Sequence, residues 1–171
     1  MNAAGRSVTK IVRIACDPQA AFDFLADLGN WPLWAVVNVK STSRTDDPDW
    51  WDMVTPHGTA RLRMRACARH GILDHDFVDS QASWTVPARV VRNSDGTEFM
   101  ITFFQPPGFT DAFFDEQVSL VDIEMMKLKE LLEAMSSKRH DHGQATPGCP
   151  PISNAQCPGW PDRLQGQGGA M

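Results

Sequence analysis

Hydrophobic and polar residues alternate through the middle of the chain, between residues 36 and 105. The clearest example is residues 60–66, where Leu62 and Met64 are separated by arginines at positions 61, 63 and 65. Alternation of this kind puts one class of side chain on each face of a β-strand. The same period recurs at 37–40, 50–55, 72–78, 84–90 and 98–103, with turn-forming residues between these segments. The pattern predicts about six antiparallel strands joined by hairpins.

Two short helices are predicted ahead of these strands, after a first strand at residues 8–14. Asp17 is a good N-cap and Pro18 suits the first helical position, so a helix is expected over residues 20–28. Gly29 and Asn30 are expected to end it. Residues 31–34 follow as a second short helical turn.

A long helix is predicted after the strands, capped by Thr110 or Asp111 and continuing to about Met135. Its apolar side chains recur at steps of three and four residues, which is typical of a helix with one buried side. They are Phe114, Val118, Val121, Met125, Leu128 and Leu132. Together with the first strand, these elements predict an α+β fold whose antiparallel sheet has about seven strands.

One long helix covers only one face of such a sheet, so the other face must be polar. The polar side chains predicted there are Arg61, Arg63, Arg65, Asp74, Asp76, Arg89 and Glu98. Cross-strand pairing of these arginines and aspartates is expected. The opposite face carries large apolar side chains. A strongly bent sheet closed by one helix can leave a cavity for an apolar ligand, although the same side chains could also fill a solid core.

Composition changes sharply after residue 136. Residues 137–171 contain 6 Gly and 5 Pro among 35 residues and few large aliphatic side chains. Such a segment buries too little apolar surface to offset the entropy lost on ordering. The sequence therefore predicts a folded ligand-binding domain at 1–136 and a flexible Pro/Gly-rich tail at 137–171, which also contains Cys149 and Cys157.

Charge and missing motifs exclude several classes of function. The 171 residues carry a net charge of −5, so a nucleic-acid partner is not expected. No apolar run reaches the roughly 20 residues of a membrane span, and the first residues lack the apolar core of a secretory signal. We expect a cytoplasmic protein that is a monomer or a homodimer. Nucleotide-binding and zinc-protease motifs are absent and the 4 Cys form no C-x-x-C pair, so neither a cofactor nor a metal is predicted.

Three segments of the chain match the pattern of a known superfamily: residues 17–22 (DPQAAF) followed by Trp31 and Trp34, residues 95–99 (DGTEF) and residues 128–133 (LKELLE). They resemble the opening, the last strand and the last helix of the START-type helix-grip superfamily. This superfamily includes polyketide cyclases and dehydrases, pollen-allergen-like proteins and lipid-transfer domains. The resemblance implies a helix-grip fold, in which a curved antiparallel sheet surrounds a long C-terminal helix. It supplies no catalytic residue, because the superfamily has no universal one.

The expected function is binding of a small hydrophobic or aromatic molecule, lipid- or polyketide-like, between the sheet and the C-terminal helix. The side chains predicted to line the pocket are Trp51, Met64, His75, Phe77, Trp84, Phe99, Ile101, Phe103, Phe114, Val121 and Met125. Two alternatives remain open: a cyclase or dehydrase that uses the same cavity, and a protein-interaction module that uses the charged sheet face.

His75 is the only candidate for catalysis in this set. It falls on the apolar face of its strand, where an imidazole could act as a general acid or base. It could equally be satisfied by a backbone carbonyl or a buried water. The chain has 6 Trp and 9 Phe but no Tyr, so the pocket is expected to have few polar groups, and this favours binding over catalysis.

Overall fold

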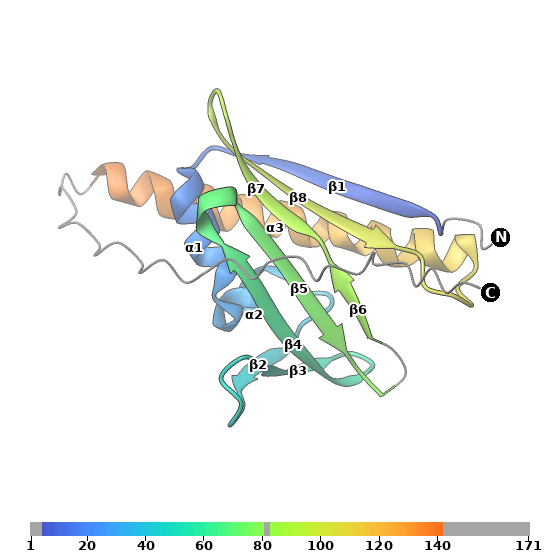
Figure 1. The fold of residues 1–171 in the computed structure, drawn as a ribbon. Helices are drawn as coiled ribbons and strands as arrows, with labels where there is room; N and C mark the ends of the chain where they lie inside the picture. The colour runs from blue at the N-terminus through green and yellow to red at the C-terminus, as the bar shows by residue number, and fades with distance from the viewer. Residues whose placement is uncertain (1–4, 81–82, 142–171) are drawn as a thin grey trace, which may run out of the picture.

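A computed structural model of the protein describes residues 5–80 and 83–141 (Figure 1). Within these ranges, the strands are β1 (Ser7–Ile14), β2 (Ser41–Arg44), β3 (Trp51–Thr55), β4 (Gly58–Cys67), β5 (Ile72–Val78), β6 (Ser83–Val86), β7 (Ala88–Asn93) and β8 (Gly96–Phe104). The helices are α1 (Pro18–Ala26), α2 (Trp31–Trp34) and α3 (Asp111–Asp141), with single 3₁₀ turns at Leu28–Asn30 and Ala68–His70.

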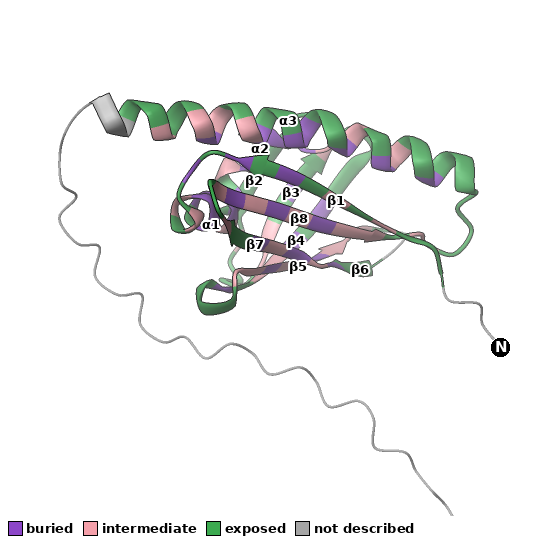
Figure 2. Cartoon of the chain, turned by 90° about the horizontal axis from the view of Figure 1, so that it is seen from above, coloured by how far each residue is buried: buried purple, intermediate pink, exposed green. Residues whose placement is uncertain are grey.

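The strands form one antiparallel sheet in the order β1-β8-β7-β5-β4-β3-β2, and β6 also pairs with β5. The long helix α3 lies across one face of this sheet, with its buried residues turned toward the strands (Figure 2). It contacts the edge strand β1 directly and the short helix α2 on the other side. The predicted α+β helix-grip arrangement, with two short helices after the first strand, is confirmed.

The predicted helix starts are also confirmed. Asp17 Oδ1 accepts hydrogen bonds from the backbone N–H of Gln19 (2.9 Å) and Ala20 (3.2 Å), and Pro18 occupies the first helical position. Thr110 caps α3, since its hydroxyl oxygen accepts from the backbone N–H of Phe113 at 3.2 Å. Each cap satisfies N–H groups that have no partner within the helix. The helix α3 continues past Ser136 to Asp141, and residues 142–171 of the predicted tail lie outside the described residues.

Two predicted strand segments differ from the structure. The segment 84–90 is two strands, because Pro87 has no N–H to donate and separates β6, which pairs with β5, from β7, which pairs with β8. Residues 36–39 form a turn instead of a strand. The N–H groups of Asn38 and Val39 both donate to Ala35 O there, so the alternation of Val37 and Val39 did not indicate sheet.

The core lies between the sheet, α3 and the two short helices. All six members of the predicted apolar stripe on α3 are buried, and so are Phe22, Leu25, Trp31 and Trp34 of the short helices. No helix in the described part of the chain is long and apolar enough to cross a membrane.

Candidate functional site

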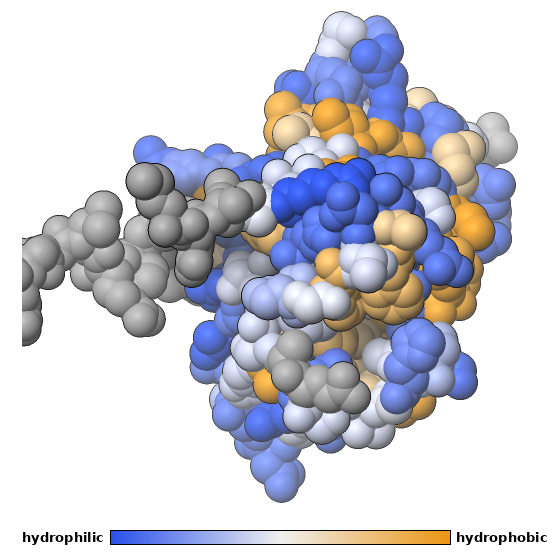
Figure 3. Space-filling model, turned by 90° about the vertical axis from the view of Figure 1, so that its right-hand side faces the viewer, coloured by the Kyte–Doolittle hydropathy of each residue, from blue (hydrophilic) through white to orange (hydrophobic). Residues whose placement is uncertain are grey.

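A cavity of about 1000 Å³ lies between the inner face of the sheet and α3. This volume is at the upper end of the range for small-molecule sites. Exposed residues line one end of the cavity, at the β3–β4 turn (Pro56, His57) and around the start of α3 (Phe109, Phe113), so the cavity opens to solvent there. Figure 3 views the molecule from this end, where hydrophobic patches lie at the surface between hydrophilic ones. The sequence left a solid core as the alternative, and this open space excludes it.

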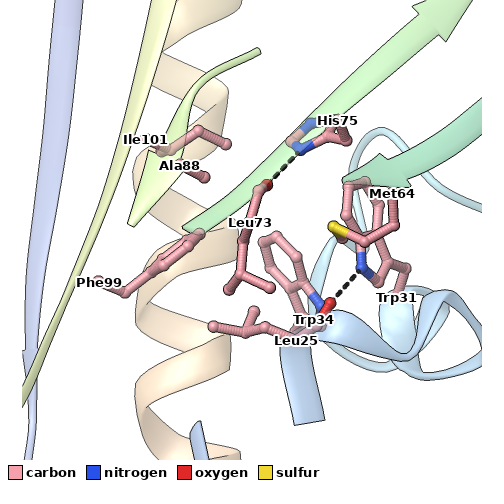
Figure 4. A pocket seen from close by; sticks show the side chains of 9 residues that line it. All are labelled: Leu25, Trp31, Trp34, Met64, Leu73, His75, Ala88, Phe99 and Ile101. Atoms are coloured by element: carbon pink, nitrogen blue, oxygen red, sulfur yellow. Dashed lines mark hydrogen bonds between the residues drawn. The ribbon is translucent and has the colours of Figure 1, made fainter. Parts of the chain in front are cut away.

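The opposite, inner end of the cavity is formed by α2 and the middle of β5. Trp31, Trp34 and His75 line both the large cavity and a small void of about 10 Å³ beside it (Figure 4). Trp31 packs edge-on against His75, with ring centroids 4.9 Å apart. Its indole Nε1–H donates to Leu25 O at 3.0 Å, which fixes the ring against α1.

Most of the side chains predicted to line the pocket do line the large cavity. They are His75, Phe77, Trp84, Phe99, Ile101, Phe103, Phe114, Val121 and Met125. Phe77 and Trp84 pair across β5 and β6 and stack at 4.8 Å, which forms one aromatic wall. Met64 lines the small void instead.

Trp51 lies outside both cavities, contrary to its predicted place in the lining. A side chain at Gly29 would contact the Trp51 ring at 3.7 Å, so Trp51 packs beneath the 3₁₀ turn that precedes α2. The guanidinium of Arg44, on the neighbouring strand β2, lies 4.6 Å from the centroid of the Trp51 ring. The alternation gave the correct face of β3, but the short helices cover that face at the Trp51 end.

Sequence reasoning missed several lining residues. Trp31 and Trp34 carry the resemblance to the superfamily but were not assigned to the pocket, although their i, i+3 spacing puts both on one side of a helical turn. Phe109 and Phe113 lie at the opening. Phe109 precedes α3 in a segment without a repeating pattern, and Phe113 lies in the first turn of α3 outside its apolar stripe. Glu124 also lines the cavity. It lies three residues after Val121, and this helical spacing could have predicted that the two side chains share one face of α3.

His75 is neutral in this site. Its Nδ1 lies 3.2 Å from Leu73 O, and a carbonyl oxygen only accepts, so Nδ1 carries the hydrogen. Burial lowers the pKa of His75 to about 4, despite the opposing effects of the Leu73 carbonyl and the nearby carboxylates. An imidazole with this pKa is unprotonated at pH 7, so it is a hydrogen-bond acceptor through Nε2 and a poor general acid.

Glu124 is a buried carboxyl group in the helix side of the cavity. Its Oε1 accepts from the backbone N–H of Val37 (3.0 Å) and Asn38 (2.8 Å), and its Oε2 accepts from Asn38 Nδ2 (3.1 Å). These bonds join α3 to the turn after α2. Burial raises the pKa of Glu124 above its ordinary value, and the three hydrogen bonds oppose that rise.

The outer sheet face is a network of ion pairs, as predicted. Asp76 accepts from Arg63 (2.7 Å) and Arg65 (2.6 Å), and Asp74 pairs with Arg89. The hydrogen bonds from Thr85 and Arg63 and the charge of Arg65 outweigh burial and hold the pKa of Asp76 below its ordinary value. The arginines of this face are therefore largely neutralised by their own strand neighbours, which weakens the alternative of a protein-interaction module on the charged sheet face.

Within residues 5–80 and 83–141, no three side chains of His, Cys, Asp or Glu come together in a way that could hold a metal ion. The cavity is instead apolar over most of its wall.

Comparison with known proteins supports the fold. No family model matches the chain, and no curated protein matches its sequence. Among solved structures, a START superfamily protein from Mycobacterium smegmatis matches with a TM-score of 0.51 and 15% identity, over 79% of this chain and 99% of that one. The di-domain ARO/CYC StfQ from the steffimycin biosynthetic pathway matches with a TM-score of 0.54 and 18% identity, over 78% of this chain and 46% of that one.

A third match is Ara h 8.0201, a Bet v 1-like allergen, with a TM-score of 0.57 and 8% identity, over 75% of this chain and 98% of that one. Identities this low say nothing about ligand or activity, because one fold serves many functions. The comparisons therefore show that the chain shares the helix-grip fold of these proteins.

Proposed function

We propose that the protein binds a small hydrophobic molecule in the cavity between the sheet and α3. The observation that carries this proposal is the open space of about 1000 Å³ with a mainly apolar and aromatic wall. An unfilled apolar space lowers the stability of a fold, because side chains around it lose both burial and dispersion contacts. A ligand that fills the space restores those contacts. Each square ångström of apolar surface removed from water contributes about 25 cal/mol.

The first test is native mass spectrometry of the purified full chain, which we expect to detect a co-purified apolar molecule. The second is a fluorescence titration with the neutral probe 1-aminoanthracene. The double variant Val118→Trp/Val121→Trp adds two indoles to the helix wall of the cavity. We expect it to weaken probe binding by roughly tenfold, or about 1.4 kcal/mol.

The matched control is Ile123→Trp/Met126→Trp, which adds the same two indoles to the exposed side of the same helix. We expect this variant to bind the probe as the unmodified chain does. Equal weakening in both double variants would mean that the probe binds elsewhere on α3. The proposal would also fail if neither a co-purified molecule nor any probe binding were found.

A cyclase-type enzyme is the second candidate, and one observation favours it. Glu124 is a carboxyl group with a raised pKa inside an apolar cavity, and groups of this kind serve as general acids and bases. If the co-purified molecule is a substrate, incubation with the unmodified chain would change its mass or its ultraviolet spectrum. We expect Glu124→Gln to abolish that change and to keep binding. A molecule that stays unchanged with both proteins supports binding alone.

A further inference from the structure

The inner end of the cavity presents a hydrogen-bond acceptor to whatever fills it. His75 Nδ1 holds the ring hydrogen and donates it to Leu73 O at 3.2 Å. In a neutral imidazole the other nitrogen then carries a lone pair and no hydrogen. This tautomer is fixed by the backbone of the same strand, so Nε2 accepts before any ligand arrives.

Within the described residues, His75 Nε2 has no hydrogen-bond partner and is not among the atoms sealed from solvent. Among the hydrogen bonds of the described residues, His75 takes part through Nδ1 only. Two side-chain polar atoms in that part of the chain are sealed from solvent without a partner, Trp34 Nε1 and Arg65 Nε, and His75 Nε2 is not one of them. The ring lines both the large cavity and the adjoining void of about 10 Å³. That void is close to the smallest space that holds a single water oxygen.

The two indole donors beside this acceptor are already used or are out of reach. The Trp31 indole N–H is bonded to Leu25 O. The Trp34 indole N–H is sealed, and its ring packs edge-on against Phe99 and against Trp31. Glu124, the other buried polar side chain of the lining, accepts three hydrogen bonds. A ligand at the inner end therefore meets acceptors and apolar rings.

We propose that the inner end of the cavity recognises a hydroxyl group on an otherwise apolar ring compound, and that His75 Nε2 accepts the hydroxyl hydrogen. This inference rests on the proposed function, because it needs a ligand in the cavity. It narrows the ligand class to ring compounds that carry a hydrogen-bond donor at the end that reaches the inner end of the cavity. Such a compound should bind more tightly than an ether or a hydrocarbon of the same shape. A hydrogen bond between neutral groups contributes about 0.5–1.5 kcal/mol, so the preference is expected to be roughly three- to tenfold in Kd.

The test compares three probes of nearly equal shape, 2-naphthol, 2-methoxynaphthalene and 2-methylnaphthalene, by calorimetric titration of the full chain at pH 7.5. We expect 2-naphthol to bind roughly three- to tenfold more tightly than the other two. In His75→Leu all three should bind about equally. In His75→Gln, whose amide oxygen can accept, part of the preference should return.

His70→Leu is the matched control, because His70 is exposed in the 3₁₀ turn Ala68–His70 and lines neither the cavity nor the void. It should keep the full preference for 2-naphthol. If His75→Leu fails to fold, nitrogen NMR of the unmodified chain gives the same answer. The Nε2 resonance of His75 should move on addition of 2-naphthol and stay in place with 2-methylnaphthalene.

The outcomes separate the two proposals. Equal affinity of the unmodified chain for all three probes would overturn the role of His75 and leave hydrophobic binding standing. A preference for 2-naphthol that survives in His75→Leu would likewise overturn it. Absence of binding for every probe would overturn both proposals together.

Discussion

His75 and Asp76 are neighbours in β5 whose side chains lie on opposite faces of the sheet. Both residues are almost wholly buried, with 6% and 8% of their surface exposed. Asp76 keeps its charge, because Arg63, Arg65 and Thr85 all donate to its carboxylate. His75 gives up its charge, because its surroundings are aromatic rings and one backbone carbonyl. The cost of burying an ionisable group is therefore met differently at these two neighbouring residues. Asp76 stays charged and is paired on the outer face, whereas His75 is uncharged on the inner face.

The contrast explains why the two faces serve different purposes. A charge that is fully paired within the sheet stabilises strand register and leaves little for a partner to bind. A neutral group with one unused acceptor among apolar side chains adds specificity to a surface that otherwise binds by burial alone. The outer face thus has the chemistry that holds strands in register, and the inner face has the chemistry that the proposed ligand binding needs.

The largest expected effect is on the outer face, where Asp76→Asn removes the charge shared by Arg63 and Arg65. The two guanidinium groups then face each other without a carboxylate between them. Because they are a third or more exposed, water offsets part of the loss. We expect the free energy of unfolding to fall by about 2–3 kcal/mol, as measured by urea denaturation.

Asp52→Asn is the control for this prediction. Asp52 belongs to the same sheet, but its side chain is 61% exposed and lies 3.9 Å from Arg61. Its loss is expected to change stability by less than about 0.5 kcal/mol. Similar losses in the two variants would remove the distinction between a paired buried charge and a surface pair.

The second prediction concerns pH and the inner face. The unfolded chain takes up a proton on His75 below its ordinary pKa of 6.5, but the folded chain does so only near pH 4. The folded state is therefore destabilised as pH falls from 6.5 toward 4. The loss attributable to His75 is expected to be about 2 kcal/mol at pH 5, relative to pH 7.5.

This pH dependence is measured as the difference between the unmodified chain and His75→Gln. The comparison is needed because Glu124, with a raised pKa, changes stability in the opposite direction in the same acidic range. We expect the curve of unfolding free energy against pH to be flatter in His75→Gln. Parallel curves for the two proteins would mean that His75 is not held neutral.

The same pair of residues shows how far the sequence could predict the site. Alternation alone put His75 inside and Asp76 outside, because the face of a strand residue depends only on its parity. Likewise, the spacing in α3 identified its buried stripe correctly. The predicted strand at 84–90 failed where Pro87 interrupts it, which a stricter rule about proline would have found.

Other features depend on contacts that no local pattern contains. Glu124 is held by the N–H groups of Val37 and Asn38, which lie in a distant turn of the chain. Trp51 is covered by the 3₁₀ turn near Gly29 instead of facing the cavity. The cavity itself exists because side chains from several elements together leave a volume unfilled. A list of inward-facing residues identifies the wall of the cavity, but it does not show how much volume the side chains leave unfilled.

The smallest expected effect concerns Thr85, whose hydroxyl bonds to both Asp76 and Arg65. The Thr85 hydroxyl donates to Asp76 Oδ1 at 2.6 Å and accepts from Arg65 Nη2 at 2.9 Å. Thr85→Val keeps the shape and the strand propensity but removes both bonds, so we expect a loss of about 0.5–1 kcal/mol. The pKa of Asp76 should also rise, because one of the groups that hold it low is gone.

Carbon NMR of the Asp76 carboxyl group during an acid titration measures that rise directly. Asp76 stabilises the fold above its ordinary pKa, and this contribution is lost as pH falls through its lower folded value. In Thr85→Val the loss should therefore be smaller and should end at a higher pH, because only the folded value has risen. Thr59→Val, an exposed threonine near the start of β4, should leave the titration of Asp76 unchanged. If Thr85→Val also left it unchanged, the arginines alone would keep Asp76 charged, and the hydroxyl would serve only to orient Arg65.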